Sequence, residues 1–217
     1  MTKPRFTGVF TALVTPFHDD GTVDLTAYRA LIEDQLAMGL SGLVPCGTTG
    51  EASTLTTDEH AQVVKTCVDT VNKRVPVIAG SGANDTKKAI ETHKRIAELG
   101  VDGSLQVTPW YNKPTQEGLY RHFRAVAESN PLPIVLYNVP GRTGVDMLPE
   151  TIVRLAKDCP SIVAVKEATG SIQRAQDILN KVERTDFSVL SGDDGLILGL
   201  VAIGGHGVIS VTSLVCG

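Results

Sequence analysis

Residues 162–170 read IVAVKEATG, and this stretch is the starting point for predicting the fold. Its first four residues are all apolar, without the alternation that marks a strand with one face in water. A continuous apolar run is typical of a strand covered on both faces in a parallel sheet. Lys166 and Glu167 follow directly, so we expect a buried strand that ends in two charged residues.

Seven other stretches are of the same kind, and most of the segments between them have the pattern of amphipathic helices. Helix starts are indicated at Asp24, Thr56 with Glu59, Asp85, Pro149 and Ser171, and helix ends at Gly39 and Gly100. A strand–helix unit that recurs about every thirty residues is the βαβ period. Eight units predict an α/β fold, the (β/α)8 TIM barrel, which usually takes about 250 residues. The seven stretches are residues 8–16, 42–50, 75–82, 102–109, 133–140, 188–194 and 205–212.

The alternative fold is an open, doubly wound sheet. A dinucleotide fingerprint would favour it, but Gly80-Ser81-Gly82 is followed by Asp85 where the third glycine should be. No domain boundary is apparent, so residues 1–217 are predicted to be a single barrel domain. The chain stops just after the eighth strand, and we expect the outer face of that strand to be uncovered. On this reading the barrel is truncated and lacks its eighth helix and C-terminal helical region.

Composition excludes several classes of protein. A net charge of −4 over 217 residues argues against a nucleic-acid surface. The uncharged run at residues 196–215 is long enough to span a membrane, but Gly204, Gly205 and Gly207 would break such a helix, so we expect a short helix, a turn and a strand. The four cysteines are far apart and predict free thiols in a cytoplasmic protein.

Polar side chains gather where the predicted strands end, which is where barrels of this type carry their chemistry. Hydroxyl groups dominate, with a single lysine and a single tyrosine, and neither a metal nor another cofactor is expected. Asp193 and Asp194 disfavour a phosphorylated substrate at the end of the seventh strand. The strand-end residues are Thr15, Thr48, Thr49, Ser81, Thr108, Tyr137, Asn138, Lys166, Glu167, Asp193 and Ser210.

Lys166 is the candidate nucleophile. A free lysine with a pKa of about 10.4 is neutral in only about one molecule in a few thousand at pH 7. Burial lowers that pKa and frees the lone pair to attack a carbonyl. The alternative is a structural lysine that pairs with Glu167 or another nearby carboxylate.

Four motifs resemble the dihydrodipicolinate synthase family of pyruvate-dependent class I aldolases, within the N-acetylneuraminate lyase superfamily. They are GTTGE at 47–51, VTPWYNKP at 107–114, LYNVPGRTG at 136–144 and VKEATG at 165–170. The resemblance runs in order from Phe6 to the end of the chain. It implies a lyase that condenses pyruvate with L-aspartate-4-semialdehyde to 4-hydroxy-tetrahydrodipicolinate, in diaminopimelate and lysine biosynthesis.

The resemblance also implies a role for each matching residue. Lys166 would form a Schiff base with pyruvate, and Tyr137 would shuttle protons through Thr48 to Tyr111 of a neighbouring subunit. Thr48 and Thr49 would hold the pyruvate carboxylate, although both also suit an ordinary turn. Arg142 would bind the carboxylate of the semialdehyde, and backbone at Gly192 and Ile209 would line the site.

Arg142 favours the synthase over relatives that cleave sialic acid or keto-deoxy sugar acids, which generally lack an arginine after YNxP. A barrel that has lost catalysis and serves as a binding protein is the alternative from another class. Retention of Thr48, Tyr111, Tyr137, Arg142 and Lys166 together argues against it.

Regulation and assembly are also implied only by the resemblance, which suggests a homotetramer built as a dimer of dimers. Many relatives bind lysine at a dimer interface, and the matching residues are Ala52, Ser53, Thr57, His60, Asn84, Lys88 and Trp110. Lys88 stands where those relatives have a glutamate, and its charge should repel a cationic effector. We therefore expect weak or absent inhibition. His60 is also compatible with an ordinary solvated helix residue.

Overall fold

The computed structural model describes residues 5–216 and contains one eight-stranded sheet. All neighbouring strands are parallel, in the order β2-β1-β8-β7-β6-β5-β4-β3. The strands are β1 (Gly8–Ala12), β2 (Gly42–Val44), β3 (Ile78–Gly80), β4 (Gly103–Val107), β5 (Ile134–Asn138), β6 (Ile162–Glu167), β7 (Ser188–Ser191) and β8 (Gly207–Ser210). Each lies within one of the eight stretches identified in the sequence.

The two ends of this strand order meet and close the sheet. Leu43 and Val77 form a parallel bridge, and the backbone N–H of Gly80 donates to the carbonyl of Pro45 at 2.9 Å. The predicted (β/α)8 barrel is therefore confirmed.

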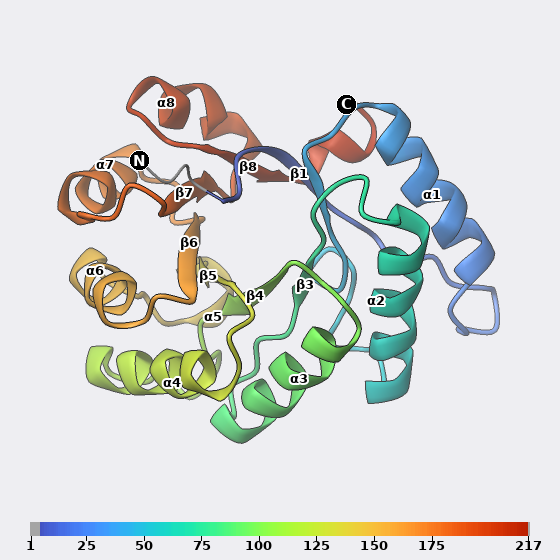
Figure 1. Cartoon of the computed structure of the whole chain (residues 1–217), viewed down its shortest axis with the longest axis horizontal. Helices are drawn as coiled ribbons and strands as arrows, with labels where there is room; N and C mark the ends of the chain where they lie inside the picture. Colours follow the sequence, from blue (N-terminus) through green and yellow to red (C-terminus); the bar gives the residue numbers. More distant parts are fainter. Residues whose placement is uncertain (1–4, 217) are drawn as a thin grey trace.

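Helices surround the strands (Figure 1). They are α1 (Leu25–Ala37), α2 (Thr57–Val71), α3 (Thr86–Glu98), α4 (Gln116–Ser129), α5 (Pro140–Thr143), α6 (Pro149–Asp158), α7 (Ile172–Lys181) and α8 (Ile197–Ala202), with 3-10 turns η1 (Asp194–Leu196) and η2 (Thr212–Leu214). The structure confirms the start signals. Asp24, Asp85 and Ser171 accept hydrogen bonds from backbone N–H groups in the first turns, and Thr56 with Glu59 forms a capping box.

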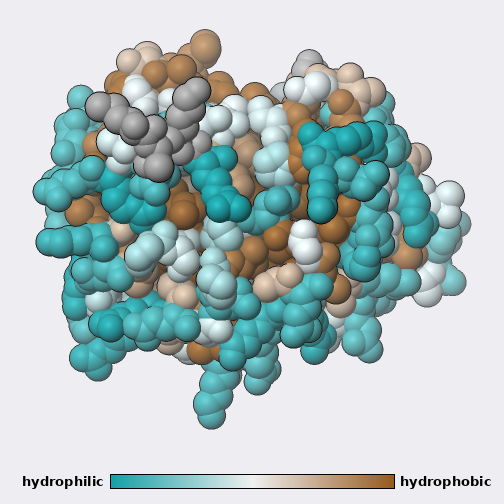
Figure 2. All heavy atoms as spheres, viewed as in Figure 1, coloured by the Kyte–Doolittle hydropathy of each residue, from teal (hydrophilic) through white to brown (hydrophobic). Residues whose placement is uncertain are grey.

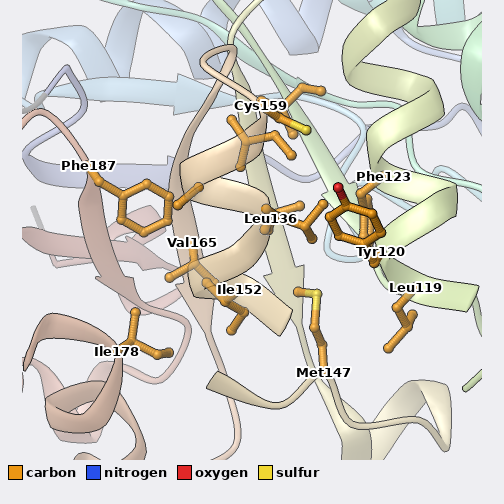
Figure 3. Packing of buried hydrophobic residues seen from close by; sticks show 14 of the residues in the cluster. Leu119, Tyr120, Phe123, Leu136, Met147, Ile152, Cys159, Val165, Ile178 and Phe187 are labelled. Atoms are coloured by element: carbon orange, nitrogen blue, oxygen red, sulfur yellow. The ribbon is translucent and has the colours of Figure 1, made fainter. Parts of the chain in front are cut away.

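Apolar residues fill the space on both sides of the strands, as the continuous apolar runs predict. All six residues of β6 are buried. One cluster lies inside the barrel and includes Phe10, Val135 and Leu190. A larger cluster lies between the strands and helices α4, α6 and α7, where Leu136 and Val165 point towards Phe123 and Ile152 (Figure 3).

The expectation that the outer face of β8 would be uncovered is wrong. All four residues of β8 are buried, because α8 and η1 lie against this strand and the Ser210 hydroxyl accepts a hydrogen bond from the Ser213 backbone N–H of η2 at 2.9 Å. Leu214 packs against the cluster that contains Tyr28 and Ile32, and the hydroxyls of Thr11 and Ser213 form a 2.8 Å hydrogen bond. The short helix α8 and the 3-10 turns therefore do part of the covering that we assigned to a missing helix.

Hydrophilic residues line much of the rim on the face shown in Figure 2, and hydrophobic residues are visible between them. Some of these lie over α8, where Leu198 is 84% exposed. Among residues 5–216, none of the helices has the length and apolar character needed to cross a membrane. The four cysteines are free, as predicted, and only Cys216 is exposed.

Candidate active site

A cavity of about 340 Å³ opens where the strands end at their carboxyl termini. Its polar lining comes from four of the strand–loop units, those of β2, β5, β6 and β7, and its apolar lining includes strand residues such as Ala12 and Val44. Six of the predicted site residues belong to it: Thr48, Thr49, Tyr137, Arg142, Lys166 and Gly192.

Lys166 and Tyr137 are direct neighbours across two strands. They are partners in the register of β5 and β6, so their side chains leave the sheet on the same side. The Nζ atom of Lys166 lies 4.4 Å from the centre of the Tyr137 ring. The predicted amine and phenol are thus brought together by strand pairing alone.

The Lys166 amine lies in an environment that favours its neutral form. The side chain is only 6% exposed. Its pKa is lowered to about 8, mainly by burial; the Asp194 carboxylate opposes this by raising the pKa, and the Arg142 guanidinium contributes to the lowering. With a pKa of about 8, roughly one molecule in ten carries the free amine at pH 7.

The alternative in which Lys166 pairs with Glu167 is wrong. Successive residues of a strand point to opposite faces, so Glu167 leaves the sheet on the helix side. There its carboxylate accepts hydrogen bonds from the Asn138 side chain at 3.3 Å and from the Thr169 backbone N–H at 2.9 Å. No ion pair involves Lys166 within residues 5–216.

Tyr137 is positioned as a protonated phenol near neutral pH. Burial raises its pKa above the ordinary value, and this effect exceeds the opposing influences of Arg142 and of a hydrogen bond with the Thr48 side chain. Thr48 and Tyr137 are therefore neighbours at the cavity.

Thr48 and Thr49 lie in a tight turn after β2. Cys46 before it and Glu51 after it have positive φ angles of 53° and 54°. Gly50 leaves no room for a side chain, because a Cβ there would lie 2.9 Å from the carbonyl oxygen of Leu13. The turn is thus held in one shape, with Thr48 exposed at the cavity.

Two of the residues predicted for catalysis or substrate binding do not line this cavity. Ile209 is 1% exposed and belongs to the cluster inside the barrel, so its side chain is part of the core. Tyr111 is 88% exposed and has a φ of 71°, which is costly for a residue with a bulky side chain. Its ring therefore does not approach Thr48 within this chain.

An adjoining cavity of about 470 Å³ shares Thr48, Tyr137 and Arg142 with the first. Of the predicted regulatory residues, Ser53 and His60 line it. Ala52, Thr57 and Trp110 also line it, whereas Asn84 and Lys88 do not. The amide of Asn84 donates instead to the backbone carbonyl of Trp110 at 3.4 Å.

The reading of His60 as a solvated residue is wrong. Its ring is half-buried, and Nε2 lies 2.8 Å from the carbonyl oxygen of Gly80. Burial lowers its pKa below the ordinary value.

Sequence analysis named Asp194 only as a residue that disfavours a phosphorylated substrate, and it missed the influence of this carboxylate on Lys166. Its carboxylate accepts hydrogen bonds from the backbone N–H groups of Val211 and Thr212 at 3.1 and 3.0 Å, which ties the loop after β7 to the end of β8. Its position just after a strand end was a usable signal. Leu105, Val139, Ala168 and Val211 also line the cavity, and no sequence signal distinguishes them from ordinary core residues. Residues 5–216 contain no group of three or more histidine, cysteine, aspartate or glutamate side chains placed to hold a metal ion.

Known proteins with the same architecture have similar sequences. The chain is 53% identical over 209 residues to a protein named 4-hydroxy-tetrahydrodipicolinate synthase from Nitratidesulfovibrio vulgaris, which covers 96% of this chain and 71% of that relative. A structure described as the chloride-inhibited dihydrodipicolinate synthase from Acinetobacter baumannii complexed with pyruvate superposes with a TM-score of 0.94 at 48% identity, over 97% of this chain and 72% of that one.

A third relative bears on regulation. It is described as the dihydrodipicolinate synthase from Cyanidioschyzon merolae with lysine bound, and it superposes with a TM-score of 0.95 at 46% identity over 98% of this chain and 72% of that one. The model of the dihydrodipicolinate synthetase family matches residues 5–217. The relatives are similar over most of the chain, and a buried lysine lies beside a tyrosine at the mouth of the barrel. Together with the match to the family model, these observations show that the chain belongs to the dihydrodipicolinate synthetase family.

Proposed function

We propose that the chain is a 4-hydroxy-tetrahydrodipicolinate synthase, a lyase that condenses pyruvate with L-aspartate-4-semialdehyde in diaminopimelate and lysine biosynthesis. The observation that carries this proposal is the buried Lys166 amine with a lowered pKa, beside the Tyr137 phenol and in a cavity that Arg142 also lines. The names of the relatives support the same activity.

The first step joins pyruvate to the protein. The neutral amine of Lys166 attacks the keto carbon of pyruvate, and loss of water gives an imine. Thr48 and Thr49 offer hydroxyl and backbone N–H groups to the pyruvate carboxylate from the turn after β2. The protons that move in this step pass through the Tyr137 phenol, which is protonated at the start.

The imine makes the methyl group of pyruvate acidic, and removal of one of its protons gives an enamine. Its carbon attacks the aldehyde carbon of the semialdehyde, and the aldehyde oxygen takes up a proton. The amine of the semialdehyde then attacks the imine carbon and displaces Lys166, which closes the six-membered ring. The net reaction releases one water molecule and returns the free enzyme.

Arg142 supports the choice of the second substrate. It is exposed at the edge of the cavity on the short helix α5, and a guanidinium can bind a carboxylate through two parallel hydrogen bonds. The carboxylate of the semialdehyde fits this role better than the hydroxyl groups of a sugar acid. A protein that turns over sialic acid but leaves L-aspartate-4-semialdehyde unchanged would contradict the proposal.

Borohydride reduction in the presence of pyruvate tests the covalent step. The expected result is the mass of a reduced pyruvate adduct on the peptide that contains Lys166. The Lys166→Ala variant should show none. An adduct on another lysine, or an unmodified protein, would contradict the assignment.

We further propose that the protein acts as a homo-oligomer, a dimer of dimers, in which Tyr111 completes the relay of a neighbouring subunit. The exposed ring of Tyr111, held at a positive φ, supports this assignment. Light scattering on the purified protein tests the assembly. In a mixture of Tyr111→Phe and Lys166→Ala proteins, recovered activity would support sharing of residues between subunits, and no recovery would count against it.

A further inference from the structure

The side chain of Asn138 lies directly behind the catalytic pair. Asn138 and Glu167 follow Tyr137 and Lys166 and are themselves register partners in β5 and β6. Because side chains alternate along a strand, they project to the helix side while Tyr137 and Lys166 face the cavity. Asn138 is completely buried, and it does not line the cavity.

Every polar atom of the Asn138 amide has a partner. Its Oδ1 accepts a hydrogen bond from the backbone N–H of Met147 at 3.0 Å. Its Nδ2 donates to Asp146 Oδ1 at 3.0 Å and lies within reach of the Met147 carbonyl at 3.4 Å and of Glu167 Oε2 at 3.3 Å. The strand residue thus bonds to a segment that lies nine positions further along the chain.

The segment between these partners carries Arg142. It begins at Val139, forms α5 and turns at Gly144, which has a φ of 72°. Its far end is fixed again at Met147, whose side chain is buried in the cluster outside the strands (Figure 3). Asn138 therefore closes this loop at its base, where the chain leaves and returns to β5.

We propose that Asn138 is a positioning residue that holds the loop of residues 139–147, and with it Arg142, in the place where Arg142 meets the second substrate. This inference rests on the proposed function, because it assumes that Arg142 binds the carboxylate of that substrate. Lys166 and Tyr137 are held by the strands themselves, so the pyruvate half of the reaction depends much less on this clamp.

An amide is the side chain that these neighbours require. Asp146 and Glu167 are acceptors and the Met147 N–H is a donor, so the group between them must both donate and accept. Leucine or alanine at position 138 would leave the Met147 N–H without its partner inside the protein, which is destabilising. Aspartate would retain the acceptor but place a third carboxylate beside Asp146 and Glu167.

The test measures the two halves of the reaction separately in Asn138→Ala. Formation of the pyruvate adduct is followed by borohydride trapping over a range of pyruvate concentrations, and the KM for L-aspartate-4-semialdehyde is measured at saturating pyruvate. We expect that KM to rise at least tenfold, while the pyruvate concentration for half-maximal trapping changes less than twofold. Asp146→Asn changes a half-buried loop residue and should also raise the KM for L-aspartate-4-semialdehyde. This second variant tests the inference if Asn138→Ala does not fold.

The matched control is Arg184→Ala. Arg184 donates to the carbonyl oxygens of Ala156 and Ile162 at 3.0 and 2.9 Å, so it fastens the start of β6, at the end of the strand away from the cavity. We expect Arg184→Ala to lose a similar amount of thermal stability. It should nevertheless leave unchanged the ratio between the KM for L-aspartate-4-semialdehyde and the pyruvate concentration for half-maximal trapping. The inference would be overturned if Asn138→Ala weakened pyruvate trapping and raised the KM for the semialdehyde by equal factors, or if it changed neither.

Hydrogen exchange gives a readout that does not need turnover. The amides of residues 139–147 should exchange faster in Asn138→Ala, with little change in the turn of residues 46–51. Unchanged protection of residues 139–147 would overturn the inference. A wild-type protein that traps pyruvate but does not consume the semialdehyde would count against the proposed function, and the exchange measurement would still decide the role of Asn138.

Discussion

Gly192 lies against the end of the Lys166 side chain and leaves it no spare room. A Cβ placed on Gly192 would lie 3.1 Å from Cε of Lys166 and 2.5 Å from Cβ of Ala168. The first residue after β7 therefore sets how far the lysine extends into the cavity.

Replacement of Gly192 by alanine should displace the lysine and slow the reaction. We expect kcat to fall about tenfold to a hundredfold, because an ångström of misplacement at a reacting atom can cost this much. The matched control is Gly141→Ala, since a Cβ there has no neighbour within 4 Å. Borohydride trapping with pyruvate should be slowed in the first variant alone, and equal trapping rates in both would contradict the steric argument.

The rate of pyruvate adduct formation should depend on pH through the Lys166 amine. Because its pKa is lowered to about 8, the neutral fraction should rise about tenfold per unit at pH values below 8 and level off above it. Initial trapping rates between pH 6 and 10 measure this profile. A rise that continues to above pH 10 would mean that the amine has the pKa of an exposed lysine.

Tyr137→Phe should still form the pyruvate adduct, although more slowly, and should lose most of the turnover. The variant removes the hydroxyl that moves protons and keeps the ring beside the lysine, so we expect kcat to fall by about 10²–10⁴, the usual contribution of general acid–base catalysis. The thermal midpoint should change little. Steady-state kinetics and mass mapping of the trapped adduct measure both properties, and a kcat within a factor of about three of wild type would contradict the role of the phenol.

The fold should lose stability in mild acid through His122. Its ring is buried and bonded to the Thr86 hydroxyl at 2.8 Å, and burial lowers its pKa to about 4. The ring is protonated near pH 6.5 in the unfolded chain, so its contribution is present above about pH 6.5 and is lost as the pH falls towards 4. We expect a loss of about 1–3 kcal/mol over this range.

Denaturation at pH 7.5 and pH 5 compares wild type with His122→Gln. The variant should lose less stability between the two pH values than wild type does. The control is His18→Gln, because the His18 side chain is 55% exposed. Identical pH dependence in wild type and His122→Gln would contradict the argument.

Inhibition by lysine should be weak, because Lys88 adds a positive charge at a position matched to a glutamate in inhibited relatives. Lys88→Glu should increase the sensitivity of the reaction to lysine. Activity measured against L-lysine from micromolar to millimolar concentrations tests both statements. Strong inhibition of the wild-type protein at micromolar lysine would refute the expectation.

The sequence by itself determined the barrel and the two members of the proposed catalytic pair. Continuous apolar runs and cap residues such as Asp24 and Asp85 are local signals, so they could be read without knowing which segments meet. The alternation of side chains along a strand then placed Lys166 and Tyr137 on one face as soon as β5 and β6 were paired.

Tertiary structure decided the features that depend on distant segments. Asp194 influences Lys166 only because the loop after β7 is tied to the end of β8, and Asn138 holds the Arg142 loop only because Met147 returns to it. The covering of β8 by α8 and η1 likewise depends on where these short elements pack. The energies of such contacts depend on burial and on polar groups that only folding brings together. A local pattern of residues therefore cannot predict them.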